Sequence, residues 1–168
     1  MSKKIILRLS NELGNQMFMY ASAYSIAKKL NRELYIDNET AFLTKKNVSN
    51  YRLSSFNITS SIAPDKYKFK KLSGYIKRKF LIKSDFLNSK RKFFIENKDK
   101  NKITSYSDDY KSIQFDDCLF LEGHYESEKY FDEIKDEIKK EFKIKNFILF
   151  QKNQFFKNLN KQNSVGIC

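Results

Sequence analysis

The feature that most constrains the fold is an apolar run near the N-terminus, followed by a turn and an amphipathic stretch. Residues 5–9 (Ile-Ile-Leu-Arg-Leu) predict a buried strand, and Gly14 lies in the turn that follows. Apolar residues then recur at helical spacing: Met17, Tyr20, Ala21, Tyr24, Ala27 and Leu30. A strand, a tight turn and a helix form half of a βαβ unit, so the sequence predicts an α/β fold with parallel strands.

The turn between this strand and helix is a candidate ligand site. Open α/β sheets bind ligands at the carboxyl ends of their strands, where free N–H groups of a helix point into the crevice. Asn15 is the natural N-cap of the predicted helix, and Gln16 can turn its amide outward. The alternative is a well-capped first helix that holds no ligand, because a single glycine is a weaker signal than a complete glycine-rich fingerprint.

Composition limits the class of protein. The chain has 168 residues, of which 40% are apolar and 15% aromatic, which is typical of one globular domain rather than a disordered segment. Its two cysteines, Cys118 and Cys168, do not make a disulfide framework and are expected to be buried, reduced thiols. Neither a signal peptide nor an apolar run of membrane-spanning length is present, so we expect a cytoplasmic protein.

The middle of the chain predicts a second strand and several loops. Residues 34–37 (Leu-Tyr-Ile-Asp) predict a strand parallel to the first, reached by a right-handed crossover. Asp37 lies where a dinucleotide fold has its ribose-binding acid, but the missing glycines favour a strand-end residue that caps the next turn. Residues 51–58 predict a loop with buried apolar anchors. The acidic pairs at 108–109 and 116–117 are expected in loops and turns.

The most basic segment is Lys66–Lys92, which contains eleven Lys or Arg residues and a single acid, Asp85. Aromatic residues are interleaved with these cations: Tyr67, Phe69, Tyr75, Phe80 and Phe86. Cations and aromatics together are typical of surfaces that hold single-stranded nucleic acid or that lie on an anionic membrane. The alternative is a core of aromatic residues below a solvated lysine face. The net charge of +13 is compatible with all three interpretations.

A further buried strand is predicted at residues 118–121 (Cys-Leu-Phe-Leu), followed by Glu-Gly-His-Tyr. His124 is the only histidine of the chain, and it has no Cys or acidic partner at metal-ligand spacing, so no metal site is expected. A helix should follow, with Ser127 as its candidate N-cap. Its expected buried stripe consists of Phe131, Ile134, Ile138 and Phe142.

Two segments of the chain resemble one enzyme family. Residues 13–18 (Leu-Gly-Asn-Gln-Met-Phe), followed by Met-Tyr-Ala, resemble the N-terminal signature of the bacterial α-1,2-fucosyltransferases of glycosyltransferase family 11. Asn11 and Glu12 stand where that signature has two glycines, and Asn tolerates a positive φ better than most residues. Residues 120–131 (Phe-Leu-Glu-Gly-His-Tyr-Glu-Ser-Glu-Lys-Tyr-Phe) resemble a second segment of the family, in which an aromatic pair follows the glycine.

The end of the sequence resembles the approach to the donor-binding motif of that family. Residues 164–167 (Ser-Val-Gly-Ile) match the strand that leads into His-x-Arg-Arg-x-Asp, whose arginines are associated with the diphosphate of the GDP-sugar. Cys168 stands at the expected histidine position, and the sequence ends there. The resemblance therefore implies that the donor-binding C-terminal domain is absent from this sequence and that the fragment alone is inactive.

The resemblance implies an α/β fold, namely the Rossmann-like N-terminal domain of a GT-B-type glycosyltransferase, with residues 1–168 as its acceptor-side domain. The reaction would move fucose from GDP-fucose to the 2-hydroxyl of a galactose in a glycan, with no cofactor and no metal. Gly14, Asn15 and Gln16 should line the cleft, and His124 and Tyr125 should contact the acceptor glycan. No residue is assigned as the catalytic base.

Two other classes of function remain open. The chain could be a non-catalytic module that binds a glycan or a nucleotide sugar, or a basic nucleic-acid-binding domain that uses Lys66–Lys92. The expected partners are a galactose-containing glycan, GDP-fucose and an anionic membrane, contacted peripherally through Lys66–Lys92 on its cytoplasmic face. Nucleic acid is not an expected partner.

Overall fold

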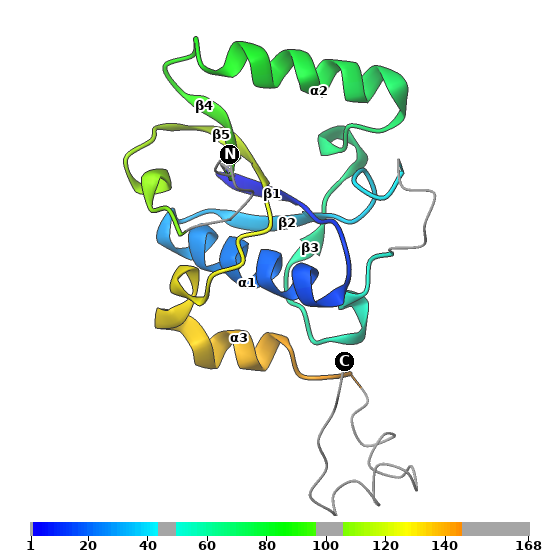
Figure 1. Ribbon diagram of the computed structural model, residues 1–168, viewed down its shortest axis with the longest axis vertical. Helices are drawn as coiled ribbons and strands as arrows, with labels where there is room; N and C mark the ends of the chain where they lie inside the picture. The colour runs from blue at the N-terminus through cyan, green and yellow to red at the C-terminus, as the bar shows by residue number, and fades with distance from the viewer. Residues whose placement is uncertain (1, 44–49, 97–105, 146–168) are drawn as a thin grey trace, which may run out of the picture.

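The computed structural model describes residues 2–43, 50–96 and 106–145, which form a parallel sheet of five strands with helices around it (Figure 1). The order in the sheet is β3-β2-β1-β5-β4, and every neighbouring pair is parallel. The strands are β1 (Lys4–Arg8), β2 (Glu33–Asp37), β3 (Ser61–Ile62), β4 (Arg91–Ile95) and β5 (Phe115–Glu122). The α/β class predicted from the sequence is confirmed, and the arrangement is compatible with a Rossmann-like fold.

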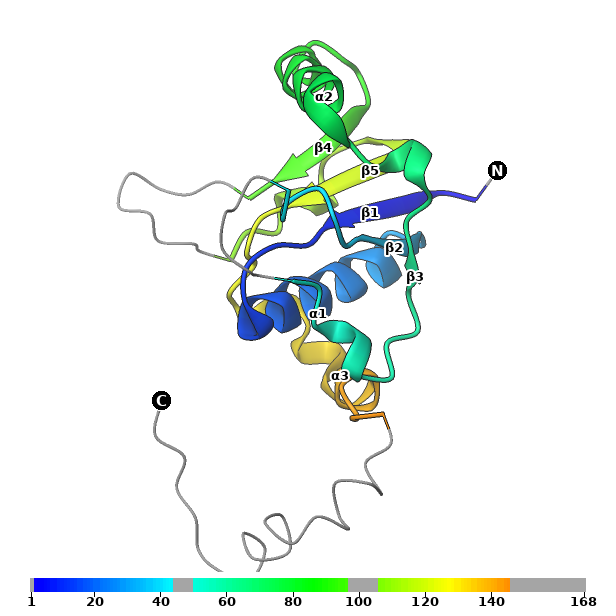
Figure 2. The ribbon, with the colours of Figure 1, turned by 90° about the vertical axis from the view of Figure 1, so that its right-hand side faces the viewer.

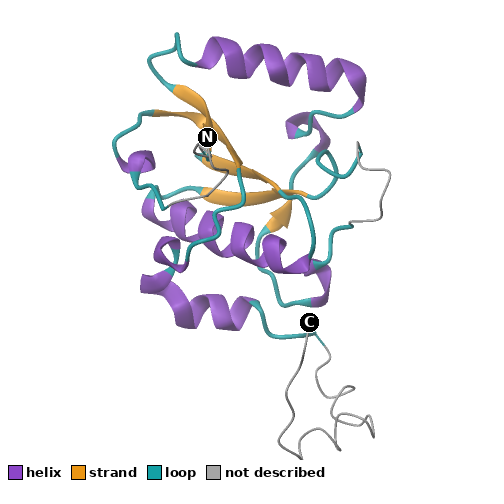
Figure 3. Cartoon of the chain, in the orientation of Figure 1, coloured by secondary structure: helices purple, strands orange, loops and turns teal. Residues whose placement is uncertain are grey.

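Three α-helices accompany the sheet within the described residues: α1 (Leu13–Lys29), α2 (Lys71–Asp85) and α3 (Lys135–Glu141). Figures 1 and 2 place α1 against one face of the sheet, with α3 beyond it. Helix α2 stands at the other end of the molecule, next to β4. Long loops join these elements at both ends of the sheet (Figure 3). No helix in the described part of the chain is long and apolar enough to cross a membrane.

The main core lies between the sheet and α1. Ile5 and Leu7 of β1 and Leu119 and Leu121 of β5 are fully buried on this side, because alternate residues of a strand point to the same face. The stripe predicted for α1 is confirmed: Tyr20, Ala21 and Ala27 are buried, and Met17, Tyr24 and Leu30 pack partly buried against the core. The burial of this stripe fixes the helix across the sheet.

The opposite face of the sheet has a smaller aromatic cluster below α2. The ring of Phe120 on β5 lies 5.0 Å from the ring of Phe93 on β4 and 5.0 Å from the ring of Phe69. Phe69 precedes α2 in the chain, so this cluster connects the start of the helix to the centre of the sheet. Of the aromatic residues in the basic segment, Phe69 is thus partly core, whereas Phe80 and Phe86 are largely exposed.

The expected N-cap of α1 is wrong by three residues. The helix begins at Leu13 with Glu12 as the N-cap residue, and Glu12 makes no side-chain capping bond. Asn15 therefore lies in the first turn of the helix. The reason is the left-handed conformation of Asn11, whose φ of 64° turns the chain early enough for the Glu12 carbonyl to accept the first helical bond from Gln16 at 2.9 Å.

The helix expected from Ser127 is also shorter than predicted. Two single 3₁₀ turns, at 128–130 and 132–134, come before α3, and Ser127 makes no side-chain capping bond. Tyr130 is fully buried, although it lies beside Phe131 and outside the predicted stripe. Phe131 and Ile134 have φ values of −128° and −123°, outside the helical range, so the chain forms single turns there before α3 begins at Lys135. Ile138 is the buried member of that stripe.

The smaller sequence predictions have mixed outcomes. Asp37 caps the turn after β2 as expected, since its carboxylate accepts bonds from the N–H groups of Glu39 and Thr40 at 3.1 and 3.0 Å. The loop at 51–58 has a fully buried anchor, Leu53. The acids at 116–117 lie inside β5, not in a loop, because Arg32 donates to the Asp116 carbonyl at 2.6 Å and supports the start of that strand.

The two cysteines also differ from expectation. Cys118 is a free thiol in β5 and is only half-buried rather than fully enclosed. The Cys168 prediction and the Ser-Val-Gly-Ile segment lie outside the described residues.

Candidate functional site at the strand switch point

The strand order creates a switch point at β1. The chain leaves β1 towards β2 on one side, and β5 lies on the other side, so the connections diverge at the carboxyl ends of β1 and β5. Ligands of open parallel sheets bind in the crevice at such a point. The turn after β1 and the loop after β5 meet here, and these are the two segments that the sequence marked as candidate site motifs.

Four polar side chains form a connected group at this point, which we call the switch-point cluster: Asn11, Asn15, His124 and Glu126. The Nδ2 atom of Asn11 lies 2.7 Å from Nε2 of His124. Asn15 donates from Nδ2 to Oε1 of Glu126 at 3.1 Å. The same Glu126 oxygen lies 3.6 Å from Nδ1 of His124. The cluster therefore presents amide, imidazole and carboxylate groups together at the carboxyl edge of the sheet.

Backbone geometry explains why the loop after β5 has this shape. Gly123 has a φ of 149°, and a side chain there would place its Cβ 2.4 Å from Cβ of Glu96. The carboxylate of Glu96, just after β4, accepts bonds from the N–H groups of His124 at 2.7 Å and Tyr125 at 3.0 Å. Glycine and Glu96 together hold His124 in position. Sequence pattern alone did not single out Glu96, because its partners lie in the loop after a different strand, β5.

Gly14, Asn15 and His124 are accessible to solvent, and their expected roles in ligand binding stay predictions. Gly14 is exposed, and a Cβ added to it would meet no atom within 4 Å. Asn15 and His124 are half-buried and come from the turn after β1 and the loop after β5, and both contact Glu126. The structure thus brings together residues from the two sequence motifs.

Gln16 does not turn its amide outward. It is fully buried, and its Nε2 donates to the backbone oxygens of Asn11 at 2.7 Å and Asn50 at 2.8 Å. Its Oε1 accepts a bond from the N–H of Arg52 at 2.9 Å. The amide is thus engaged inside the protein, because three backbone groups of two loops need partners there. Its role is to fix the turn that carries Asn11.

Tyr125 is buried as well, which corrects the expectation that its ring stacks on a sugar. Its hydroxyl donates towards the Glu122 carbonyl at 3.1 Å, and its ring packs against Tyr130 at 5.3 Å between centroids. Burial raises the pKa of this tyrosine. The left-handed φ of 52° at Tyr125 points the side chain into the core while the chain turns towards Glu126.

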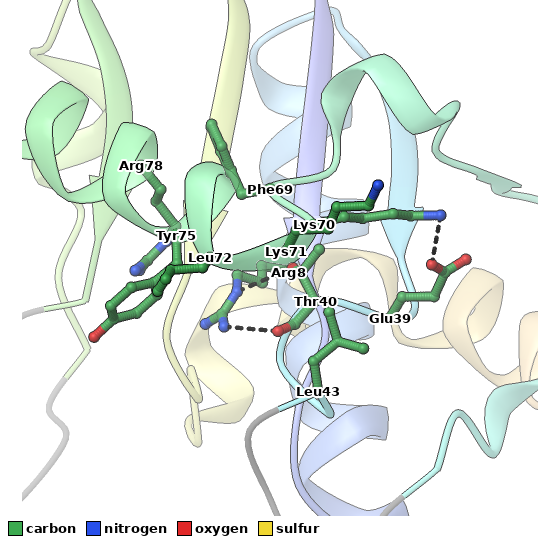
Figure 4. A pocket seen from close by; sticks show the side chains of 10 residues that line it. All are labelled: Arg8, Glu39, Thr40, Leu43, Phe69, Lys70, Lys71, Leu72, Tyr75 and Arg78. Carbon is green, nitrogen blue, oxygen red and sulfur yellow. Dashed lines mark hydrogen bonds and ion pairs between the residues drawn. The ribbon is translucent and has the colours of Figure 1, made fainter.

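A cavity of about 860 Å³ opens next to the switch point, on the face of the sheet that carries α2. Its lining includes Arg8, Thr40, Phe69, Tyr75 and Arg78. Figure 4 shows Arg8 beside Thr40 in the middle of this lining, with Tyr75 to one side. Arg8 donates from Nε to the Thr40 hydroxyl and from a terminal nitrogen to the Thr40 carbonyl, both at 3.2 Å.

Two guanidinium groups share one carboxylate at the wall of this cavity. Glu122, the last residue of β5, accepts from Nε of Arg78 at 2.7 Å and forms a second contact with the same guanidinium. A terminal nitrogen of Arg8 lies 3.9 Å from Glu122. Burial lowers the pKa of Arg8, the Glu122 carboxylate acts against that shift, and Arg78 adds to it. Positive charge thus exceeds negative charge in this trio, which suits a ligand that carries carboxylate or phosphate oxygens.

The arrangement defines a parallel α/β protein with a cluster of polar side chains at the carboxyl edge of its sheet. Among residues 2–43, 50–96 and 106–145, no group of three or more His, Cys, Asp or Glu side chains is placed to hold a metal ion. No protein-family model matches the chain, and it matches neither a curated protein nor a solved structure.

Proposed function

We propose that the chain is the acceptor-side domain of an α-1,2-fucosyltransferase, which transfers fucose from GDP-fucose to the 2-hydroxyl of a galactose in a glycan. One observation carries the proposal. The two segments that resemble this family are far apart in the sequence, yet they meet through the bonds of Asn11 with His124 and of Asn15 with Glu126. The parallel pairing of β1 with β5 brings the two loops side by side, and their polar side chains then bond to each other there.

The switch-point cluster has the chemistry needed to hold a sugar. A pyranose presents hydroxyl groups that both donate and accept hydrogen bonds, and the amide of Asn15 and the carboxylate of Glu126 offer a matching donor and acceptors. Gly14 leaves open space beside them, so a sugar ring can approach the helix backbone closely. Gln16 and Tyr125 are buried below the cluster, and their hydrogen bonds to backbone groups hold the two loops in place.

Galactoside binding to the purified chain tests the proposal by saturation-transfer NMR. Lactose ends in a β-galactose, and cellobiose is the matched control because its terminal sugar differs only at one hydroxyl. We expect saturation transfer to the galactose ring of lactose and none to cellobiose. Asn15→Leu should abolish the signal, whereas Lys139→Gln, on the exposed side of α3, should leave it unchanged. Equal signals from both sugars, or a signal that survives Asn15→Leu, would contradict the proposal.

A second candidate is a module that binds a nucleotide sugar without catalysis, and the cavity favours it. Arg8, Lys71 and Arg78 line the cavity with positive charge, while Glu39 is the acid in its lining. A diphosphate is a suitable partner for such a site. Calorimetry with GDP is the direct measurement. GDP binding that is lost in Arg8→Met while lactose gives no NMR signal would favour this candidate over the first.

A further inference from the structure

We propose that the outer face of α2 docks the protein onto an anionic membrane surface. The starting observation is that large apolar side chains gather on this helix and its C-terminal end with unusual exposure. Leu72 is 73% exposed, Ile76 58% and Phe80 70%, and they are followed by Phe86 at 65% and Leu87 at 75%. Leu72, Ile76 and Phe80 are spaced by four residues, so they form one stripe along the helix.

The stripe faces outward because the contacts of α2 with the sheet lie on its opposite side, where Leu81 and Ile82 are half-buried and polar contacts fix the helix. Arg78 in the middle of the helix forms the bidentate ion pair with Glu122 of β5. Asp85 at its C-terminal end is buried and accepts bonds from the N–H groups of Lys92 at 2.7 Å and Phe93 at 2.9 Å. Gly74 lies so close to Phe69 that a Cβ would be 2.6 Å from the Phe69 carbonyl carbon. These contacts fix the rotation of the helix about its axis.

The charges around the stripe select the partner. Lys77, Lys79 and Lys83 are exposed on the same helix, and the one acid of the basic segment, Asp85, is buried below it. Apolar side chains that enter a lipid headgroup layer, flanked by lysines that contact anionic headgroups, are typical of interfacial helices. A second copy of this chain is a poor occupant, because two faces of a protein with a net charge of +13 would repel each other.

The geometry of the whole molecule permits such docking. Figures 1 and 2 show α2 at one extremity, with the sheet on its inner side and α1 and α3 on the far side of the sheet. A flat surface can therefore contact the outer face of α2 along its length. Leu72 also lines the cavity, whereas Ile76, Phe80 and Lys83 do not, so variants at these three positions test this inference independently of the proposed function.

The chain has no tryptophan, so a single introduced tryptophan is a clean fluorescent reporter. Phe80→Trp reports on the stripe, and Phe18→Trp, at a half-exposed phenylalanine of α1, is the matched control. On vesicles of mixed phosphatidylcholine and phosphatidylglycerol we expect a blue shift of emission for Phe80→Trp alone. Vesicles of phosphatidylcholine alone should give none. A blue shift of Phe80→Trp that grows with protein concentration in the absence of vesicles would show self-association and overturn the proposal.

Charge and apolar variants separate the membrane from nucleic acid. Each lysine near an anionic surface is worth about fivefold in affinity, so Lys77→Gln, Lys79→Gln and Lys83→Gln together should weaken vesicle binding about a hundredfold. The double variant Ile76→Ser with Phe80→Ser should also weaken vesicle binding. Replacing Lys111, Lys135 and Lys139 by glutamine should leave vesicle binding unchanged. Circular dichroism verifies that each variant is folded. Binding to a single-stranded oligonucleotide that is stronger than to vesicles and unaffected by the serine variants would overturn the proposal in favour of nucleic acid.

Discussion

The Nδ2 atom of Asn11 and the Nε2 atom of His124 lie 2.7 Å apart, although 113 positions separate the two residues in the chain. With the amide as donor, Nε2 is an acceptor and the imidazole proton lies on Nδ1, on the side of Glu126. The two loops of the crevice are thus tied by side chains rather than by the sheet ladder.

Gln16 and Asn15 are neighbours with opposite expected behaviour. Gln16→Leu leaves the carbonyls of Asn11 and Asn50 and the N–H of Arg52 without their partner, so we expect a loss of about 3 kcal/mol in the free energy of unfolding. Asn15→Ala removes one hydrogen bond at the surface and should cost at most about 0.5 kcal/mol. Urea denaturation measures both. A larger loss for Asn15→Ala than for Gln16→Leu would reverse the two roles.

Glu122 carries the charge balance between Arg8 and Arg78. Glu122→Gln leaves two guanidinium groups close together with little solvent around them, so the free energy of unfolding should fall by about 3 kcal/mol. Glu137→Gln is the control, because that carboxylate pairs with Lys28 at 2.6 Å in an exposed position and should contribute at most about 1 kcal/mol. Chemical denaturation measures both losses of stability. Comparable losses in the two variants would mean that the ion pair of Arg78 with Glu122 does not hold α2 against the sheet.

Two glycines in helices should respond in opposite directions to alanine. Gly74→Ala forces a Cβ to within 2.6 Å of the Phe69 backbone, so we expect a destabilisation of about 1–3 kcal/mol and a displaced α2. Gly14→Ala meets no atom within 4 Å and lies in the first turn of α1, so it should stabilise the fold by about 0.5–1 kcal/mol. Thermal midpoints of the two variants give the signs. If Gly14→Ala also reduces lactose binding, the open space beside it is used by the ligand.

Tyrosine ionisation should unfold the protein in alkali. Burial raises the pKa values of four core tyrosines in the folded state: Tyr20, Tyr110, Tyr125 and Tyr130. The pKa of each phenol is higher in the folded state than the unfolded value of about 10. Its contribution to the free energy of unfolding is therefore complete below pH ~10 and is lost as the pH rises beyond that value. We expect stability to fall steadily in that range, and these phenols to ionise only as the chain unfolds.

Tyr75 supplies the contrast in the same titration. It is exposed, and its hydrogen bond with Lys79, followed by the charge of that lysine, lowers its pKa. Its tyrosinate absorption should therefore appear first and reversibly, and Tyr75→Phe should remove that early component without changing the alkaline unfolding transition. A single titration shared by all ten tyrosines of the chain would show that the four core phenols are accessible after all.

The sequence predicts those parts of the fold that depend on local pattern. The strand at residues 5–9, the stripe of α1 and the turn-capping role of Asp37 follow from periodicity and from the chemistry of short polar side chains. The two candidate site motifs were also found as sequence segments. Predicting that they meet at the switch point requires the strand order of the sheet, and hydrophobic periodicity does not reveal that order.

The errors arise where a residue is used against its usual preference. A glutamine after a turn is expected to face water, but three backbone groups without partners draw Gln16 inside. For Phe80 the sequence left a core position and a surface position open, and the ion pair of Arg78 with Glu122, 44 positions away in the chain, accompanies its exposure to solvent. The sequence contained one signal of these polar contacts. Arg8 is a charged residue inside the apolar run of β1, and a charged side chain that is largely buried there needs a charged or polar partner.

The position of β1 has a consequence for how the chain folds during synthesis. This strand is central, yet one of its two neighbours, β5, begins only at Phe115, with Lys4 opposite Cys118. Until the ribosome has released that later segment, the nascent βαβ unit exposes an unpaired edge of β1 made of Ile5, Ile6 and Leu7. Such a high contact order slows folding and leaves an apolar edge open to pairing with other chains. Fragments that end before β5 should therefore need a chaperone to remain in solution.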